Sequence, residues 1–268
     1  MKHHISLDTD KMLAWSEDGI GWMVFNNPEK LNAMGVAMNA AIPTIMHSFR
    51  DDPDVRVVVM AGAGDRAFVS GADISEFEAQ RSNPETIKKY DEIGAAAGRA
   101  YGELDKPIIA MIQGFCMGGG LLTALRADLR IASDDSQFGV PAARLGLGYG
   151  YGGVKTLCDL VGFPAAQEIL LTGKRFPAAD AARWGLVNRV TSREDLEPTV
   201  HDLAATIAQN APMTIRAIRR AIQEIPKDPD HRNLDEVDAL VQACFASADY
   251  KEGRTAFMEK RRPVFQDA

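Results

Sequence analysis

The 268-residue sequence has few cysteines and no excess of positive charge. Its three cysteines, Cys116, Cys158 and Cys244, are far apart and form no CxxC or Cys/His metal spacing. We therefore expect buried thiols in a reducing compartment, and no structural zinc. The five histidines do not cluster and no HExxH motif is present, so no metal site is predicted. A net charge of −7 gives no attraction to phosphate backbones, which argues against a nucleic-acid partner.

The sequence also lacks a recognisable targeting segment. The first residues, MKHHISLDTDK, contain no apolar stretch after the positive charge, so we expect no secretory signal and a cytoplasmic location. One uncharged stretch, from Pro107 to Leu125, is long enough to span a membrane. Gln113, Thr123 and four glycines divide it, which favours a buried strand followed by a helix. We therefore expect no membrane segment.

Strand and helix patterns alternate along the first two thirds of the chain. Two apolar runs rich in β-branched residues, Val55 to Ala61 and Pro107 to Ile112, are typical of fully buried strands, and Leu129 to Ala132 is a third candidate. Residues 84–104 and 119–127 have helical character. This alternation predicts an α/β fold.

Helix-start signals dominate after Gly162. They occur at Pro164, Pro177, Arg193 and Pro212. A stretch with two prolines and several charges, residues 225–233, predicts a linker before the last two helices, at about 234–247 and 249–261. We divide the chain into a core over residues 1–200 and a C-terminal helical region over residues 201–268.

Two glycine-bearing turns carry the strongest functional signal. The segments FVSGADI, residues 68–74, and QGFCMGGG, residues 113–120, each follow a strand-like run. The first N–H groups of a helix lack partners within it, and glycine lets another group approach the backbone. The pair of turns therefore predicts a site that holds a developing oxyanion, whereas close packing of a tight turn would explain either turn alone.

These turns fall within an ordered series of segments, from Met12 to Phe265, that resembles the enoyl-CoA hydratase/isomerase family, also called the crotonase superfamily. The resembling segments are, in order, IGWMVFNNPEKLNAM, AFVSGADISEF, KPIIAMIQGFCMGGG, ADLRIASDDSQFGVPAARLGLGYGYGG, ILLTGKRFPAADAARWGLVNRV and DYKEGRTAFMEKRRPVF. The resemblance implies a crotonase-like spiral of ββα units and a C-terminal helical region that assembles homotrimers or dimers of trimers. It also implies acyl-CoA thioester substrates, and no cofactor besides the coenzyme A that is part of the substrate.

The resemblance assigns the oxyanion hole to the backbone N–H groups of Ala72 and Gly119, which would polarise the thioester carbonyl and make an enolate accessible. The CoA-binding residues that it implies are Lys30, Ala72, Asp73, Ile74, Ser75, Gly119, Phe257 and Lys260. Lys30 would lie near the CoA phosphates, and Phe257 and Lys260 would reach the CoA from a neighbouring subunit.

Four of these residues also have simpler explanations. Asp73 begins a predicted helix, where a carboxylate caps free N–H groups. Lys30 and Lys260 are equally explained as solvated surface charges, and Phe257 as a packing contact of its helix.

The sequence departs from the family pattern where a catalytic base would stand. Family hydratases use two glutamates to position and activate water, and these positions hold Leu122 and Ala142 here. Neither side chain transfers a proton or holds water by a hydrogen bond, so the paired-carboxylate mechanism cannot operate from them. Ala142 also replaces the single base of a family isomerase. Gly150 stands where some members, including dehalogenases, have an aspartate.

The predicted loop over residues 144–153 contains Arg144, Tyr149 and Tyr151 as its strong polar side chains. Family decarboxylases have a tyrosine at about the place of Tyr149, where it orients a carboxylate or supplies a proton. The alternative is a ring that packs at the mouth of an apolar pocket.

Three functions stay open at this point. The first and leading one is an acyl-CoA enzyme of the family that lacks the two hydratase carboxylates; a base could then come from elsewhere, for instance Glu76, Glu78 or Glu103. The second is enolate chemistry without the glutamate pair, such as decarboxylation of a malonyl-type thioester with Tyr149. The third is a non-catalytic subunit that binds acyl-CoA.

Overall fold

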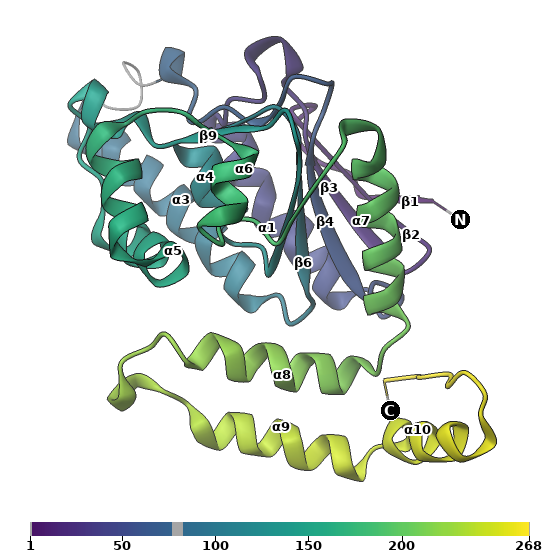
Figure 1. Ribbon diagram of the computed structural model, residues 1–268. Coiled ribbons are helices and arrows are strands. Elements are labelled where there is room, and N and C mark those ends of the chain that lie inside the picture. The colour runs from purple at the N-terminus through teal and green to yellow at the C-terminus, as the bar shows by residue number, and fades with distance from the viewer. Residues whose placement is uncertain (1, 77–82, 268) are drawn as a thin grey trace.

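A mainly parallel sheet forms the centre of the computed structural model, which describes residues 2–76 and 83–267 (Figure 1). Within these residues, seven strands pair in the order β1-β2-β3-β4-β6-β8-β11. Their bounds are His3–His4, Met12–Glu17, Ile20–Phe25, Val57–Gly62, Ile108–Ile112, Leu129–Ser133 and Arg189–Thr191. The β1/β2 and β2/β3 pairs are antiparallel and the other pairs are parallel. The three strands predicted from apolar runs are therefore confirmed as β4, β6 and β8.

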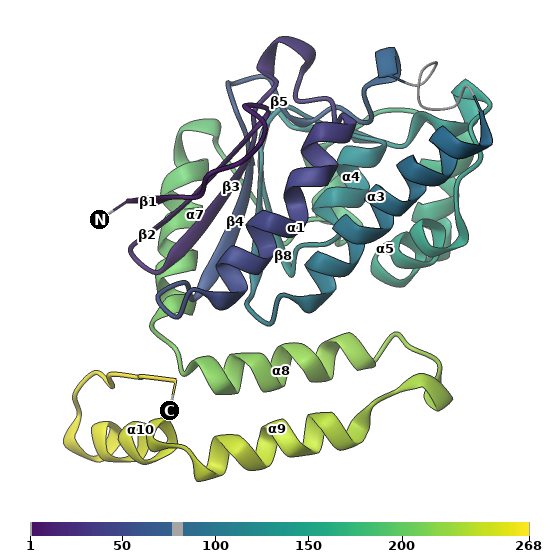
Figure 2. The ribbon, with the colours of Figure 1, turned by 180° about the vertical axis from the view of Figure 1, so that it is seen from behind.

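Helices cover both faces of this sheet, as parallel strands require. Alternate residues of β4 point to opposite faces. Val57 and Val59 belong to a cluster that includes Val200 of helix α7 (Arg193–Ala208). Val58 and Met60 belong to the cluster of helix α1 (Val36–Asp51). α1 packs against α3 (Pro84–Glu103), and both lie on the face opposite α7 (Figure 2).

A second sheet of four short strands lies beside the first, in the order β10-β9-β7-β5. Its strands are Phe176–Pro177, Gln137–Gly139, Phe115–Met117 and Ala67–Val69. β5, β7 and β9 follow β4, β6 and β8 after a few residues, and each is followed by helical structure. This repeated ββα unit confirms the predicted spiral.

The stretch from Pro107 to Leu125 contains β6, β7 and the short helix α4 (Gly119–Ala124). No helix in the two described ranges combines the length and apolar character that crossing a membrane requires. α4 ends three residues before the predicted end at residue 127. The chain turns there because Asp128 Oδ2 accepts a hydrogen bond from the N–H of Ile108 at 2.7 Å and so fixes the entry into β8.

The helix predicted to begin at Pro164 is confirmed, and another helix, which the sequence did not predict, precedes it across a kink. α5 (Tyr151–Thr172) is kinked at Gly162, where φ is 75° and ψ is 162°. Its first half comprises most of the segment YGGVKTLCDLVG, in which the glycines conceal the helical pattern. Only residues 146–150 of the predicted loop are irregular, because η3 (Pro141–Leu145) forms a 3-10 helix before them.

The remaining helices are α6 (Ala178–Arg183), α8 (Pro212–Glu224), α9 (Leu234–Ala246) and α10 (Ala248–Glu259). α8 lies between the core and α9 in both views (Figures 1 and 2). Arg219 of α8 attaches it to the core, since its Nε lies 2.8 Å from Asp128 Oδ2 and its Nη1 donates to the carbonyl of Leu104. α7 continues without a break through residue 200, and the division into 1–200 and 201–268 stays a prediction.

Of the cysteines, Cys116 is buried as predicted, and burial raises the pKa of its thiol. Cys158 and Cys244 are partly exposed, so the prediction of buried thiols is wrong for these two. Both lie on helices at the margin of the core, where one face of the helix remains open to solvent.

Candidate active site

The two glycine-bearing turns lie side by side. The first, with Gly71 and Ala72, follows β5, and the second, with Gly118 and Gly119, follows β7. β5 and β7 pair in parallel, so both turns leave the same edge of the small sheet. A Cβ atom added to Gly119 would lie 3.6 Å from the backbone nitrogen of Ala72. The structure therefore brings together the two residues to which the sequence assigns the oxyanion hole.

The backbone N–H of Ala72 is directed away from its neighbouring strand. Ala72 forms an isolated parallel bridge with Met34. Met34 donates its N–H to the carbonyl of Gly71 at 2.8 Å and accepts from the N–H of Asp73 at 2.9 Å. In a parallel pair with this pattern, the central residue points its own polar groups to the other side. The N–H of Ala72 has no acceptor within the described part of the chain.

Gly119 supplies a second free donor. It is the first residue of α4, and the first N–H groups of a helix have no partner within the helix. Gly118 precedes it with φ of 52° and ψ of −116°, a conformation that favours glycine. Within residues 2–76 and 83–267, no acceptor contacts the N–H of Gly119. Two free donors at one point are the arrangement that stabilises an oxygen gaining negative charge.

Gly120 holds the two turns close together. A Cβ atom at this position would overlap the carbonyl oxygen of Val69, at the end of β5. Only a residue without a side chain therefore allows α4 to approach β5 this closely. The spacing of the two N–H groups depends on this contact.

Lys30, Asp73 and Ser75 form one hydrogen-bonded cluster beside the first turn. Lys30 Nζ lies 2.8 Å from Asp73 Oδ2 and 2.9 Å from Ser75 Oγ. Asp73 Oδ1 accepts from the N–H of Ser75 at 3.0 Å, which confirms the capping role predicted for this carboxylate. The hydrogen bond from Lys30, followed by that from Ser75, lowers the pKa of Asp73. Ile74 lies between them with an exposed side chain.

The two positions that lack glutamates lie close to the second turn. Leu122 is on α4, one turn after Gly118, whose carbonyl accepts its N–H. Ala142 is buried in η3 as part of the main core cluster. Both are apolar, so neither contributes a proton donor or acceptor through its side chain.

Tyr149 packs its ring near Leu122. A Cβ atom on Gly153 would lie 3.1 Å from both Tyr149 Cε1 and Leu122 Cδ2, which shows that the two side chains converge on the first turn of α5. Burial raises the pKa of Tyr149 to about 12. The phenol is therefore neutral at physiological pH, so it is available as a hydrogen-bond donor and not as a base. Of the other polar side chains of this segment, Tyr151 is 79% exposed, and the stem of Arg144 lies against Gly173.

Of the three glutamates that could serve as alternative bases, two already accept hydrogen bonds or form ion pairs, and the third lies outside the described residues. Glu76 Oε2 accepts from the N–H of Val36 at 2.9 Å and caps α1. Glu103 Oε2 lies 3.0 Å from His47 Nε2 at the far end of α3. Glu78 falls outside the described residues. Elsewhere in the described ranges, no three His, Cys, Asp or Glu side chains are grouped closely enough to hold a metal ion.

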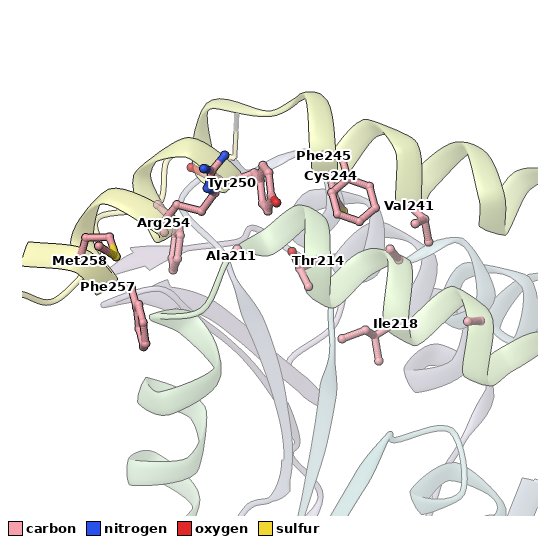
Figure 3. Close-up of a pocket in the computed structure, with 15 residues that line it drawn as sticks. Ala211, Thr214, Ile218, Val241, Cys244, Phe245, Tyr250, Arg254, Phe257 and Met258 are labelled. Carbon is pink, nitrogen blue, oxygen red and sulfur yellow. The ribbon is translucent and has the colours of Figure 1, made fainter. Parts of the chain in front are cut away.

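Helix α10, which carries Phe257 and is followed directly by Lys260, lies at the opposite end of the molecule from β5 (Figure 2). A single chain therefore does not bring them to the oxyanion turns. Phe257 is 82% exposed, so it is not a packing contact of α10. It lines an apolar groove of about 850 Å³ between α8, α9 and α10 (Figure 3). We call this feature the C-terminal groove; its other apolar members include Ile218, Val241, Phe245, Tyr250 and Met258.

Sequence reasoning missed a small cavity between α1, α3 and α4, which we call the α3 cavity. Its volume is about 120 Å³, and Met34 and Leu122 connect its wall to the two turns. Tyr101 of α3 and Arg126, just after α4, also line it. The spacing of Gly94, Gly98 and Tyr101 on one helical face is the signal that would have indicated a gap beside an aromatic side chain.

Comparison with known proteins agrees with this geometry. Residues 16–268 match the sequence profile of the family described as enoyl-CoA hydratase/isomerase. The chain belongs to the enoyl-CoA hydratase/isomerase family. It is 33% identical over 257 residues to the short-chain-enoyl-CoA hydratase of Clostridium acetobutylicum, covering 96% of this chain and 97% of that relative. It is 35% identical over 242 residues to the carnitinyl-CoA dehydratase of Citrobacter koseri, covering 88% and 91% of the two chains.

A crystal structure of an enoyl-CoA hydratase/carnithine racemase from Magnetospirillum magneticum superposes with a TM-score of 0.90. The two chains share 32% identity, and 97% of each is covered. Processing of acyl-CoA thioesters is therefore the activity class of this family member. Because positions 122 and 142 are apolar, membership of the family does not by itself specify the reaction.

Proposed function

We propose that this protein binds an acyl-CoA thioester with the carbonyl oxygen between the N–H groups of Ala72 and Gly119. The observation that carries the proposal is that both donors are free and that the two residues are adjacent. Donors fixed in this way stabilise the negative charge of a thioester enolate, and removal of one donor from such a site costs about 100-fold or more in rate.

The reaction that fits this site forms the enolate without a carboxylate base. Leu122 and Ala142 offer no proton transfer, so water addition and proton abstraction at these positions have no side chain to assist them. Loss of carbon dioxide from a malonyl-type thioester needs no base. The bond between the α-carbon and the carboxylate breaks, its electron pair forms the enolate, and the α-carbon then takes up a proton.

Tyr149 is suited to assist this reaction as a neutral phenol. Its ring lies with Leu122 against the start of α5, and its raised pKa keeps the proton on the oxygen. A phenol donor orients the departing carboxylate or delivers the proton to the α-carbon. The engaged carboxylates of Glu76 and Glu103 favour this function over an enzyme with a relocated glutamate base.

In this proposal, a second copy of the chain completes the CoA-binding site. The C-terminal groove leaves several large apolar side chains exposed, among them Phe257 and Met258. Exposed apolar patches of this kind mark interaction surfaces. We propose that the C-terminal region assembles trimers or dimers of trimers, in which Phe257 and Lys260 of one subunit approach the CoA bound by another. Lys30 would then approach the CoA phosphates from its own subunit.

Mass spectrometry of substrate mixtures tests the reaction. Purified protein is incubated with crotonyl-CoA, a longer enoyl-CoA, methylmalonyl-CoA and a β-keto acyl-CoA. Loss of carbon dioxide from methylmalonyl-CoA is the expected result, and gain of water by crotonyl-CoA would contradict it. If no mass changes while calorimetry still detects acyl-CoA binding, a non-catalytic binding subunit replaces the proposed enzyme.

A further inference from the structure

Asn32 is a fully buried polar residue in a strained backbone conformation. It is 0% exposed, and its φ of 55° lies in the left-handed region that residues other than glycine rarely adopt. Leu31 precedes it with a φ of 53°. Two consecutive residues in this region cost free energy, so the contacts around them must stabilise the conformation. Backbone strain of this kind is concentrated at functional sites.

The Asn32 side chain makes three hydrogen bonds that supply this stabilisation. Its Nδ2 donates to the carbonyl of Ala63 at 2.9 Å and to that of Ala67 at 2.8 Å. Its Oδ1 accepts from the N–H of Asn27 at 2.9 Å. Ala63 directly follows β4 and Ala67 begins β5, so one buried amide joins both strands to the chain that precedes α1.

The segment of residues 31–34, which contains Asn32, pairs with the first oxyanion turn. The N–H of Ser70 donates to the carbonyl of Leu31 at 3.1 Å. Met34 is the bridge partner of Ala72 and forms its backbone hydrogen bonds with the residues on either side of it. The free N–H of Ala72 points away from this pairing, so its direction depends on where residues 31–34 lie.

Met34 also contacts the helix that begins at the second oxyanion turn. Its Sδ lies 3.3 Å from Oγ1 of Thr123 on α4, and the same hydroxyl lies 2.9 Å from the carbonyl oxygen of Gly119. Met34 is 9% exposed and Thr123 is 8% exposed, so both contacts are shielded from water. Residues 31–34 therefore reach both turns, the first through backbone hydrogen bonds and the second through the Met34 side chain.

A shift of residues 31–34 would move the oxyanion donors without removing them. The Asn32 amide packs directly on the end of β4, since a Cβ atom on Gly62 would lie 2.7 Å from its Nδ2. Donors of an oxyanion hole act over a narrow range of distances, about 2.7–3.1 Å. A displacement of about 1 Å therefore costs up to about 100-fold in rate, even when it originates far from the reacting atoms.

We propose that Asn32 is a positioning residue of the oxyanion hole, which fixes the direction of the Ala72 N–H through residues 31–34. Because Asn32 is fully buried, it acts through these neighbours and not on the substrate. The inference rests on the proposed function, since that function places the thioester oxygen between Ala72 and Gly119. It adds to the site a residue that belongs to neither glycine-bearing turn.

Infrared difference spectroscopy of a bound thioester tests this role. The probe is propionyl-CoA labelled with carbon-13 at its carbonyl, because hydrogen bonds to a carbonyl oxygen weaken the C=O bond and lower its stretching frequency. Asn32→Asp keeps the shape of the side chain but places an oxygen against the carbonyls of Ala63 and Ala67. Asn32→Gly accepts the left-handed backbone and removes the side chain, so it serves if the first variant does not fold.

We expect the wild type to lower the frequency of the labelled band, and each Asn32 variant to lose about half of that shift or more. For turnover of methylmalonyl-CoA, kcat is expected to fall by about tenfold or more while KM changes less than about threefold. This split separates a displaced donor from weaker substrate binding. The band frequency is a property of the bound molecules alone, so a smaller folded fraction does not change it.

Ser133→Ala is the matched control, because it also removes a fully buried hydrogen-bonding side chain at the end of a strand. Ser133 Oγ bonds Asp135 and Ser136 after β8, which β6 separates from β4. The control is expected to keep the wild-type band shift. An equal loss of the shift in Ser133→Ala would attribute the effect to general destabilisation and overturn the proposal.

The remaining outcomes separate this inference from the proposed function. A full band shift and an unchanged kcat in the Asn32 variants overturn this inference alone. If the wild type does not shift the band, or does not bind the probe, Ala72 and Gly119 do not hold a thioester carbonyl, and the proposed function falls together with the inference.

Discussion

A Cβ atom built on Gly119 would lie 3.6 Å from the backbone nitrogen of Ala72. These residues come from two turns that are distant in sequence and are brought together by the parallel pairing of β5 and β7 and by the close contact of Gly120 with Val69. The oxyanion hole is therefore a property of the spiral fold, since each ββα unit places its turn beside the next.

Gly119→Ala tests this arrangement without disturbing the helix. The added methyl group would lie 3.6 Å from the backbone nitrogen of Ala72, beside the proposed position of the thioester oxygen, and Gly119 already has a helical conformation that alanine accepts. Turnover of the substrate is expected to fall about 100-fold or more, with the unfolding transition preserved. Gly102→Ala is the matched control, because nothing lies within 4 Å of its Cβ position on α3. Equal activity of the two variants would exclude the assigned hole.

Gly120→Ala is expected to act on folding instead. Its Cβ atom meets the carbonyl of Val69, which belongs to backbone and cannot rotate away. The free energy of unfolding, measured by urea denaturation, is expected to fall by about 1–3 kcal/mol or more as α4 moves away from β5. An unchanged unfolding midpoint would show that the two turns are not held together at this residue.

Tyr149→Phe removes the proposed donor and keeps the ring. We expect kcat/KM for loss of carbon dioxide to fall by about 100-fold. Because burial raises the pKa of Tyr149 to about 12, the phenol stays protonated below that pH, and its ionisation removes no activity between pH 7 and 10. If the wild-type enzyme loses activity between pH 7 and 10 and Tyr149→Phe does not, the phenol ionises in that range, which would contradict its role as a neutral donor.

Asp73→Asn is expected to change the pH dependence of stability. Hydrogen bonds from Lys30 and Ser75 lower the pKa of Asp73 in the folded state, so its ionised form stabilises the fold. This contribution, about 1 kcal/mol, is present above the unfolded pKa of about 3.9 and is lost as the pH falls through the lower folded value. Urea titrations of both proteins at pH 7 and pH 3 measure it. If the unfolding free energies of the wild type and Asp73→Asn differ more at pH 3 than at pH 7, the ionised Asp73 carboxylate does not stabilise the fold.

Phe257→Glu places a charge in the C-terminal groove. If this surface assembles trimers, the molar mass measured by light scattering is expected to fall to that of one chain, because a buried unpaired charge is unfavourable at an interface. Ile87→Glu, at another exposed apolar position, is the control and is expected to keep the assembly. A wild-type protein that is monomeric at assay concentration would contradict the proposed assembly through the C-terminal groove.

The sequence was informative where a local pattern determines the structure. Apolar runs predicted β4, β6 and β8, and the glycines at positions 118 and 120 marked the turn at the start of α4. The pattern failed at the first half of α5, because Gly152, Gly153 and the kink at Gly162 conceal a helix that packing supports. Tyr101 and Arg126 lie on different elements, so no sequence spacing relates them, and their shared cavity becomes visible only in three dimensions.

The most direct measurement follows the fate of methylmalonyl-CoA in deuterated water. Decarboxylation at the Ala72–Gly119 site predicts propionyl-CoA that has lost carbon dioxide and gained one deuteron from solvent at the same carbon. Gly119→Ala is expected to suppress both changes together, and an enzyme-free sample gives the background exchange of the substrate. Intact methylmalonyl-CoA beside hydrated crotonyl-CoA would contradict the account, since it would require water activation at a site where Leu122 and Ala142 provide none.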